Sequence, residues 1–178
     1  MDLARTHKKL GEAQAWLGNM FEQDGLMIRG RFDDYLSAFL SAGMSVRDGF
    51  HYKQDQPRNA AVKAWCKKWE DALTADEQDL YEFMRVNRNA EVHTTGAALA
   101  VVKEPVRVGV GSSYSDRSST LEVFGSPSVL LGHDTAAVIQ KRTHYLTVGN
   151  TKQKATAVCT AYLALLQRMV AEFEADHS

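Results

Sequence analysis

The sequence predicts a single, mainly helical domain over residues 1–178: an antiparallel helical bundle with a small antiparallel β-sheet inserted before the last helix. Over residues 1–96, apolar residues recur at the three- and four-residue intervals of amphipathic helices. Between residues 97 and 149, glycines, prolines and β-branched residues cluster, which is typical of short strands joined by turns. The helical pattern returns over residues 150–178, and we find no repeat or low-complexity tract.

The apolar pattern divides the helical parts into five segments. We expect them at residues 3–21, 27–50, 58–73, 75–93 and 151–174. Small residues in the second segment, such as Gly43, are expected to allow close packing of helices. The fourth segment begins with Thr74-Ala75-Asp76-Glu77, which fits a capping box. In this motif the Thr74 hydroxyl accepts from a backbone N–H of the first turn, and Glu77 reaches back.

The inserted segment contains four runs rich in valine, leucine and other strand-forming residues. We expect strands near residues 101–102, 106–110, 121–124 and 138–148. On the last of these, Arg142 and His144 share one face, because side chains alternate along a strand. We therefore consider both as substrate-binding residues that line a cleft, with solvent-facing strand residues as the alternative.

Charge and hydropathy narrow the range of partners. The chain has 21 basic and 22 acidic side chains, so a nucleic-acid partner requires a local basic patch. The near-neutral charge also argues against broad, unspecific RNA binding, and we expect no DNA partner. The charged N-terminal residues do not resemble a signal peptide, and no apolar run reaches the ~20 residues of a membrane helix. We expect a cytoplasmic protein without a membrane partner.

No residue pattern predicts a metal or a cofactor. Cys66 and Cys159 are far apart and lie in helical patterns, so we expect two small buried hydrophobic residues. His51, His133 and His144 are scattered, whereas a metal site needs three or four converging ligands.

The end of the fourth helical segment carries the best functional motif. Arg85, Asn89 and His93 recur every four residues, so they form one stripe. Arg88 lies 140° from His93 on an ideal helix, because each residue advances by 100°. The two groups therefore meet only through the long Arg arm, a distortion near the helix end, or a subunit interface. About one Arg–His pair of this spacing is expected by chance, so spacing alone is not decisive.

Arg88-Asn89 followed by His93, late in a bundle helix, resembles the motif of the HEPN family (higher eukaryotes and prokaryotes nucleotide-binding domains). The second helix, Phe32-Asp33-Asp34-Tyr35-Leu36-Ser37-Ala38-Phe39-Leu40-Ser41-Ala42-Gly43-Met44-Ser45-Val46, is similar to that of uncharacterised bacterial HEPN-like proteins. The last helix is similar too, over residues 161–173. The likeness covers residues 1–96 and 151–174 but not the β segment.

The resemblance implies a metal-independent endoribonuclease that works as a homodimer. Many members belong to toxin–antitoxin or other defence systems, so an antitoxin is an expected partner. Carried over, the motif makes Arg88 and His93 the catalytic pair and Asn89 its helper; Arg85 is our addition as a substrate-binding residue. Other members are inactive, so a non-catalytic RNA-binding or scaffold protein is the alternative.

Overall fold

The computed structural model describes residues 3–24, 31–51, 56–93, 99–110, 121–123 and 137–177. Within these ranges it describes only the backbone of residues 56–57, 89–93, 105–110, 121–123 and 137–140. The described residues form a mainly helical structure with an antiparallel sheet before the last helix, as the sequence predicts.

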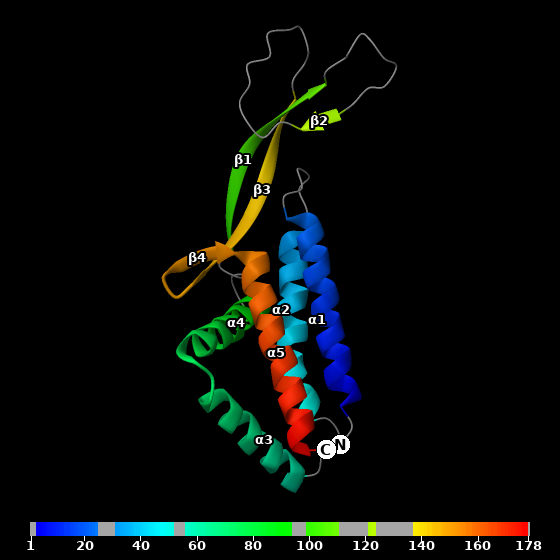
Figure 1. Cartoon of the computed structure of the whole chain (residues 1–178), viewed down its shortest axis with the longest axis vertical. Coiled ribbons are helices and arrows are strands. Elements are labelled where there is room, and N and C mark those ends of the chain that lie inside the picture. The colour runs from blue at the N-terminus through cyan, green and yellow to red at the C-terminus, as the bar shows by residue number, and fades with distance from the viewer. Residues whose placement is uncertain are drawn as a thin grey trace.

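The helices of the described residues pack around a shared apolar core. They are α1 (Ala4–Gln23), α2 (Phe32–Phe50), α3 (Gln56–Asp71), α4 (Ala75–His93) and α5 (Ala155–His177). Helices α1, α2 and α5 lie side by side along the long axis, and α3 and α4 flank them (Figure 1). None of the described helices combines the length and apolarity that crossing a membrane requires.

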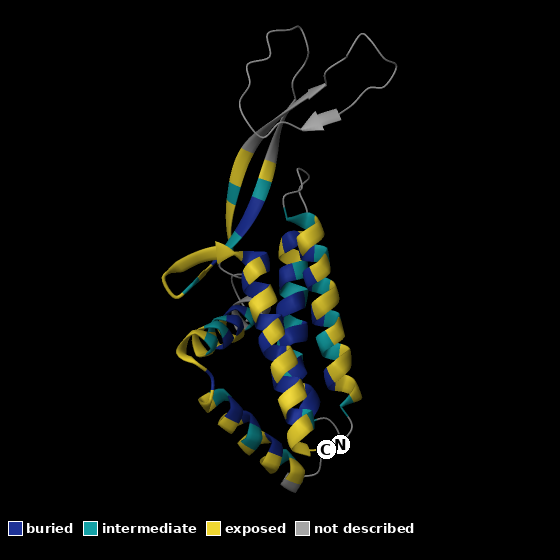
Figure 2. Ribbon diagram, in the orientation of Figure 1, coloured by how far each residue is buried: buried dark blue, intermediate teal, exposed yellow. Residues whose placement is uncertain are grey.

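The core is formed mainly by one side of α2 and of α5. Buried residues lie on the facing sides of the helices, and exposed residues lie on the outside (Figure 2). Gly43 of α2 permits the close packing expected of it, because a Cβ there would lie 2.9 Å from Cε1 of Tyr162. Cys66 and Cys159 are buried free thiols, which confirms their prediction as small buried residues.

Helices α1 and α2 approach each other closely at Gly49. A Cβ at this position would contact Oγ1 of Thr6 and would lie 2.9 Å from both the N and the Cα atoms of the same residue. These are backbone atoms, so they move only if α1 moves. The absence of a side chain at Gly49 therefore fixes the spacing of the two helices.

The sheet is antiparallel throughout and has the strand order β2-β1-β3-β4. Its strands are β1 (Leu99–Val110), β2 (Leu121–Val123), β3 (Ala137–Val148) and β4 (Thr151–Lys154). The β1–β3 ribbon projects beyond the end of the bundle (Figure 1), and we call it the arm. Strand β1 continues through Pro105, where we expected a break. It can do so because β2 pairs only with residues 108–110, which leaves the edge of β1 beside Pro105 open.

The boundaries of three helices differ from the prediction. The last helix begins at Ala155 rather than at residue 151, because Gly149 adopts a φ of +56° and turns the chain back into β4. The second helix begins at Phe32, with Arg31 as its N-cap, rather than at residue 27. The third helix covers residues 56–71 instead of 58–73.

Candidate functional site

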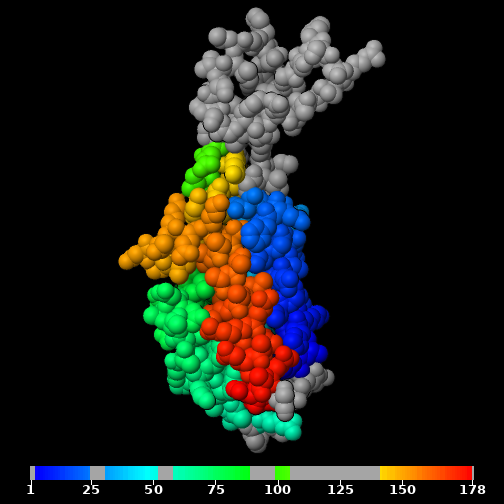
Figure 3. Space-filling view, viewed as in Figure 1, coloured from blue at the N-terminus to red at the C-terminus, as the bar shows by residue number. Residues whose placement is uncertain are grey.

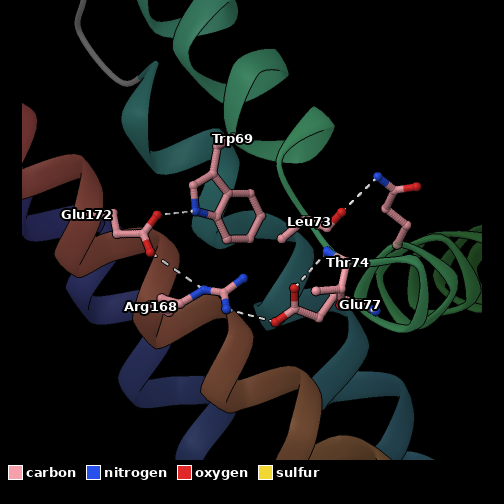
Figure 4. Close-up of polar contacts among 7 residues, drawn as sticks. Trp69, Leu73, Thr74, Glu77, Arg168 and Glu172 are labelled. Atoms are coloured by element: carbon pink, nitrogen blue, oxygen red, sulfur yellow. Dashed lines mark hydrogen bonds and ion pairs between the residues drawn. The ribbon is translucent and has the colours of Figure 1, made fainter.

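The start of α4 is fixed by the capping box that the sequence predicts. The backbone N–H of Glu77 donates to Oγ1 of Thr74 over 3.4 Å, and the N–H of Thr74 donates to Oε2 of Glu77 over 3.0 Å. Oε1 of Glu77 also accepts from Nη1 of Arg168 over 2.7 Å. Arg168, followed by the N–H of Thr74, lowers the pKa of Glu77 to about 2. The capping box thus ties α4 to α5 (Figure 4).

Helix α3 is tied to α5 by the indole groups of two tryptophans. Nε1 of Trp69 donates to Oε2 of Glu172 over 2.8 Å, and Nε1 of Trp65 donates to Oδ2 of Asp176 over 2.7 Å. Nε of Arg168 lies 3.6 Å from Oε1 of Glu172, so the same carboxylate serves both contacts (Figure 4). From the first contact to the second, the chain advances by one turn in α3 and goes back by one turn in α5, so the two helices are antiparallel.

The end of α2, α3 and the second half of α4 enclose a cleft of about 660 Å³. We call it the basic cleft, because five of its eight lining side chains are Lys, Arg or His. Its lining residues are Met44, Arg47, Asp48, His51, Lys63, Lys67, Glu70 and Arg88. Lys63 and Lys67 of α3 reach this cleft because they lie on a different side of the helix from the tryptophans that contact α5.

Part of the positive charge in the basic cleft is offset by acidic neighbours. Nη1 of Arg47 lies 2.8 Å from Oε1 of Glu70, and both side chains are about two-thirds buried. Burial opposes the charge of Arg47, but Tyr81 and Glu70 outweigh that effect and raise its pKa. At the exposed rim, Nζ of Lys67 lies 3.1 Å from a carboxylate oxygen of Asp71. Lys63 and Arg88 add further positive charge.

His51 lines the basic cleft, although the sequence presents it as one of several scattered histidines. It is the C-cap of α2, and its Nδ1 lies 3.2 Å from Oδ1 of Asn59 in α3. If that amide oxygen accepts a hydrogen bond, the imidazole proton sits on Nδ1 and Nε2 carries the lone pair. A neutral histidine of this tautomer can accept a proton from a bound ligand.

The motif residues of α4 are distributed over two clefts. Arg88 lines the basic cleft, whereas Arg85 lines a neighbouring cleft of about 420 Å³ that shares Arg47 and Glu70 with the first. The Arg85 guanidinium makes two hydrogen bonds to Glu82, of 2.6 and 2.7 Å. Helix α4 is continuous to residue 93, but the side chains of residues 89–93, and so of the predicted catalytic Asn89 and His93, lie outside the described residues.

Arg142 and His144 lie on β3, and neither lines the basic cleft or its neighbour. His144 is 7% exposed and stacks on Phe32, with ring centroids 3.8 Å apart and planes 3° apart. Its Nδ1 lies 3.5 Å from Oδ1 of Asp24 at the end of α1. His144 therefore anchors the arm to the bundle, instead of facing a substrate or solvent. Arg142 is half-buried beside it.

No family model, curated protein or solved structure matches this chain. Among the residues that the structure describes, no group of three or more His, Cys, Asp or Glu side chains is arranged to hold a metal ion.

Proposed function

We propose that the basic cleft binds RNA and that the protein is a metal-independent endoribonuclease of the HEPN type. The observation that carries this proposal is the position of Arg88. The sequence singles out this residue within the Arg–His motif, and it lines a cleft together with Arg47, Lys63 and His51. Phosphate groups bind where several basic side chains converge, and a guanidinium can contact two phosphate oxygens at once.

In the proposed reaction, the ribose 2′-oxygen attacks the adjacent phosphorus and the bond to the 5′-oxygen breaks. The attacking hydroxyl loses a proton to a base, the leaving oxygen gains one from an acid, and a 2′,3′-cyclic phosphate remains. His93 is the proposed acid–base group, since imidazole titrates near neutral pH. Arg88 stabilises the extra negative charge on the phosphorane, and Asn89 orients one of the two groups.

A homodimer is part of the proposal because of the geometry of α4. The backbone of α4 is helical to residue 93, and positions 88 and 93 of a regular helix lie 140° apart. A second copy that presents its own His93 to the cleft removes this difficulty. On the resemblance to HEPN proteins, we extend the proposal to a cytoplasmic toxin or defence protein with an antitoxin partner.

Binding of RNA without cleavage is the second candidate function. Its supporting observation is that two basic groups of the cleft already have acidic partners, Arg47 with Glu70 and Lys67 with Asp71. These ion pairs reduce the positive charge that is available to stabilise a phosphorane. Binding of uncleaved RNA requires less positive charge, because a phosphodiester carries less negative charge than a phosphorane.

The test incubates the purified protein with a mixture of structured and single-stranded RNAs in the presence of EDTA. We expect cleavage with cyclic-phosphate ends, and its loss in Arg88→Ala and in His93→Ala. Arg5→Ala is the matched control, because it removes an exposed arginine of α1 that lines neither cleft. Cleavage that survives both motif variants, or that appears only with added Mg²⁺, would refute the mechanism.

His51 gives the experiment a second branch. If His93 is the acid–base group, His51→Ala should weaken RNA binding and leave the rate at saturating RNA nearly unchanged. If His51→Ala abolishes cleavage and His93→Ala does not, the acid–base role belongs to His51. RNA binding without cleavage by the unaltered protein, at any pH from 5 to 9, would favour the non-catalytic candidate.

A further inference from the structure

Charge is divided unevenly between the sheet and the helices. The four described strands carry six basic and two acidic side chains, a net charge of +4. The five described helices carry 11 basic and 15 acidic side chains, a net charge of −4. The near-neutral total charge therefore conceals a local basic region of the kind that binding to a polyanion requires.

One face of β3 and β4 collects three lysines around a tyrosine. In the register of these strands Tyr145 is opposite Lys154, and Thr147 is opposite Lys152. Side chains alternate along a strand, so Lys141 lies on this face as well. The three lysines are exposed and Tyr145 is half-buried. We call these four side chains the lysine–tyrosine face.

The opposite face of β3 packs on the bundle, because Leu146 is 1% exposed in the core. On the opposite face of β4, Thr151 and Gln153 are exposed and line a cleft shared with Asp76 and Asp79 of α4. On the lysine–tyrosine face itself, Thr143 is 7% exposed, whereas the three lysines are open to solvent. Figure 1 shows the β3–β4 hairpin standing out beside the bundle, and Figure 3 shows it as a projection of the molecular surface.

The chemistry of this face fits a single strand of RNA better than a duplex. Nζ of Lys152 lies 4.7 Å from the centre of the Tyr145 ring, so an ammonium group and an aromatic ring are presented together. Unpaired bases stack on aromatic rings while basic side chains hold the phosphates. In a duplex the base faces are already stacked on one another. Glu104, opposite Lys141 in β1, offsets one charge and leaves Lys152 and Lys154 as the main phosphate contacts.

We propose that the lysine–tyrosine face binds single-stranded RNA, with Tyr145 stacked on a base and the lysines on the phosphates, and that the same strand continues to the basic cleft. RNA as the ligand rests on the proposed function. Ala100 is opposite Tyr145, and it is seven residues from His93. The chain between them spans at most about 25 Å, which is the length of roughly seven stacked nucleotides.

The test measures the binding of a fluorescein-labelled 2′-O-methyl oligouridine of about 16 nucleotides by fluorescence anisotropy at several salt concentrations. The 2′-O-methyl group removes the attacking hydroxyl, so binding is measured without cleavage. Lys152→Gln/Lys154→Gln should weaken binding about 25-fold at 0.1 M salt and make the salt slope shallower by about 1.4, because each phosphate contact on a single strand contributes about 0.7. Lys8→Gln/Lys68→Gln, which removes two exposed lysines elsewhere, should change neither quantity.

The stacking step has its own pair of variants. Tyr145→Ala should weaken binding about tenfold, whereas Tyr145→Phe, which keeps the ring, should bind like the unaltered protein. The lysine variants provide the decisive result even if Tyr145→Ala proves unfolded by circular dichroism, since their side chains are exposed.

Three outcomes would overturn the inference: equal loss in the two lysine double variants, tighter binding of duplex DNA than of the oligouridine, or competition by polyglutamate as effective as that by RNA. Failure of the proposed function has a different signature. In that case the oligouridine binds with the expected dependence on Lys152 and Lys154, but natural RNA stays uncleaved in EDTA. If cleavage occurs and both lysine double variants cleave equally well, the proposed function stands and the inference fails.

Discussion

Replacing Gly49 with alanine tests the close approach of α1 and α2. In an open helix position this substitution stabilises a protein by roughly 0.5–1 kcal/mol, because alanine has the higher helix propensity. At Gly49 the new Cβ would lie 2.9 Å from two backbone atoms of Thr6, whereas ordinary contacts are 3.4–4 Å. Helix α1 must therefore move outward by about half an ångström, and overpacking of this kind costs about 1–3 kcal/mol.

The expected net result is a loss of about 1–2 kcal/mol in the free energy of unfolding, measured by urea denaturation. Gly11→Ala and Gly18→Ala in α1 are matched controls, because a Cβ at either position meets nothing within 4 Å. Both should stabilise the protein, so the same substitution should change sign with position. Thr6→Ala in the Gly49→Ala background should restore only part of the loss, because the backbone atoms of residue 6 remain. Equal stabilisation by Gly49→Ala and Gly18→Ala would show that the helices are not in close contact at Gly49.

Three further predictions concern stability. The pKa of Glu77 is about 2 in the folded protein and 4.5 as the reference, so Glu77 should contribute stability above pH 4.5 that is lost as the pH falls towards 2. In Glu77→Gln, the free energy of unfolding in urea should not show this loss. If the variant loses stability at low pH as the unaltered protein does, the result contradicts the contact with Arg168. Thr74→Ala should lower the free energy of unfolding by about 1 kcal/mol, and Thr74→Ser should lower it much less, because serine keeps the capping hydroxyl. The same urea experiment measures both, and equal stability of Thr74→Ala and the unaltered protein would show that the capping hydrogen bond contributes nothing. Burial, with help from Glu70, raises the pKa of Tyr81 to about 12, so the stability that its neutral form contributes is complete below pH 10 and is lost between pH 10 and 12. In Tyr81→Phe, the free energy of unfolding should therefore fall less steeply with pH over this range. Titration of the tyrosine absorbance should show one fewer tyrosine that ionises late.

The helices and the start of α4 could be predicted from the sequence because their signals are local. The capping box depends on Thr74 and Glu77, three residues apart, and the structure confirms both of its hydrogen bonds. Strand β4 could not be predicted in this way. It requires a positive φ at Gly149 and pairing with β3, while the composition of residues 151–154 does not exclude the start of a helix.

The candidate site was predicted only in part, because it combines distant segments. Arg88 was identified from its motif, but Arg47 and Lys63 join it only through the packing of three helices. His51 carries no local signal, because its partner Asn59 lies eight residues further along the chain, on α3. The alternation of side chains predicts which face of β3 His144 shares with Arg142. It does not predict that Phe32 and Asp24, from distant parts of the chain, contact His144 on this face.

The position of β3 and β4 also gives the molecule an uneven distribution of charge. These two strands carry four basic and no acidic side chains, and they meet the bundle at the start of α5 (Figure 1), whereas the described helices carry a net charge of −4. Near a polyanion, this distribution favours an approach in which β3 and β4 face the ligand before any contact forms. The preference should weaken as added salt shortens the Debye length below its value of about 10 Å at 0.1 M salt. Association would then slow with added salt even though the protein as a whole is nearly neutral.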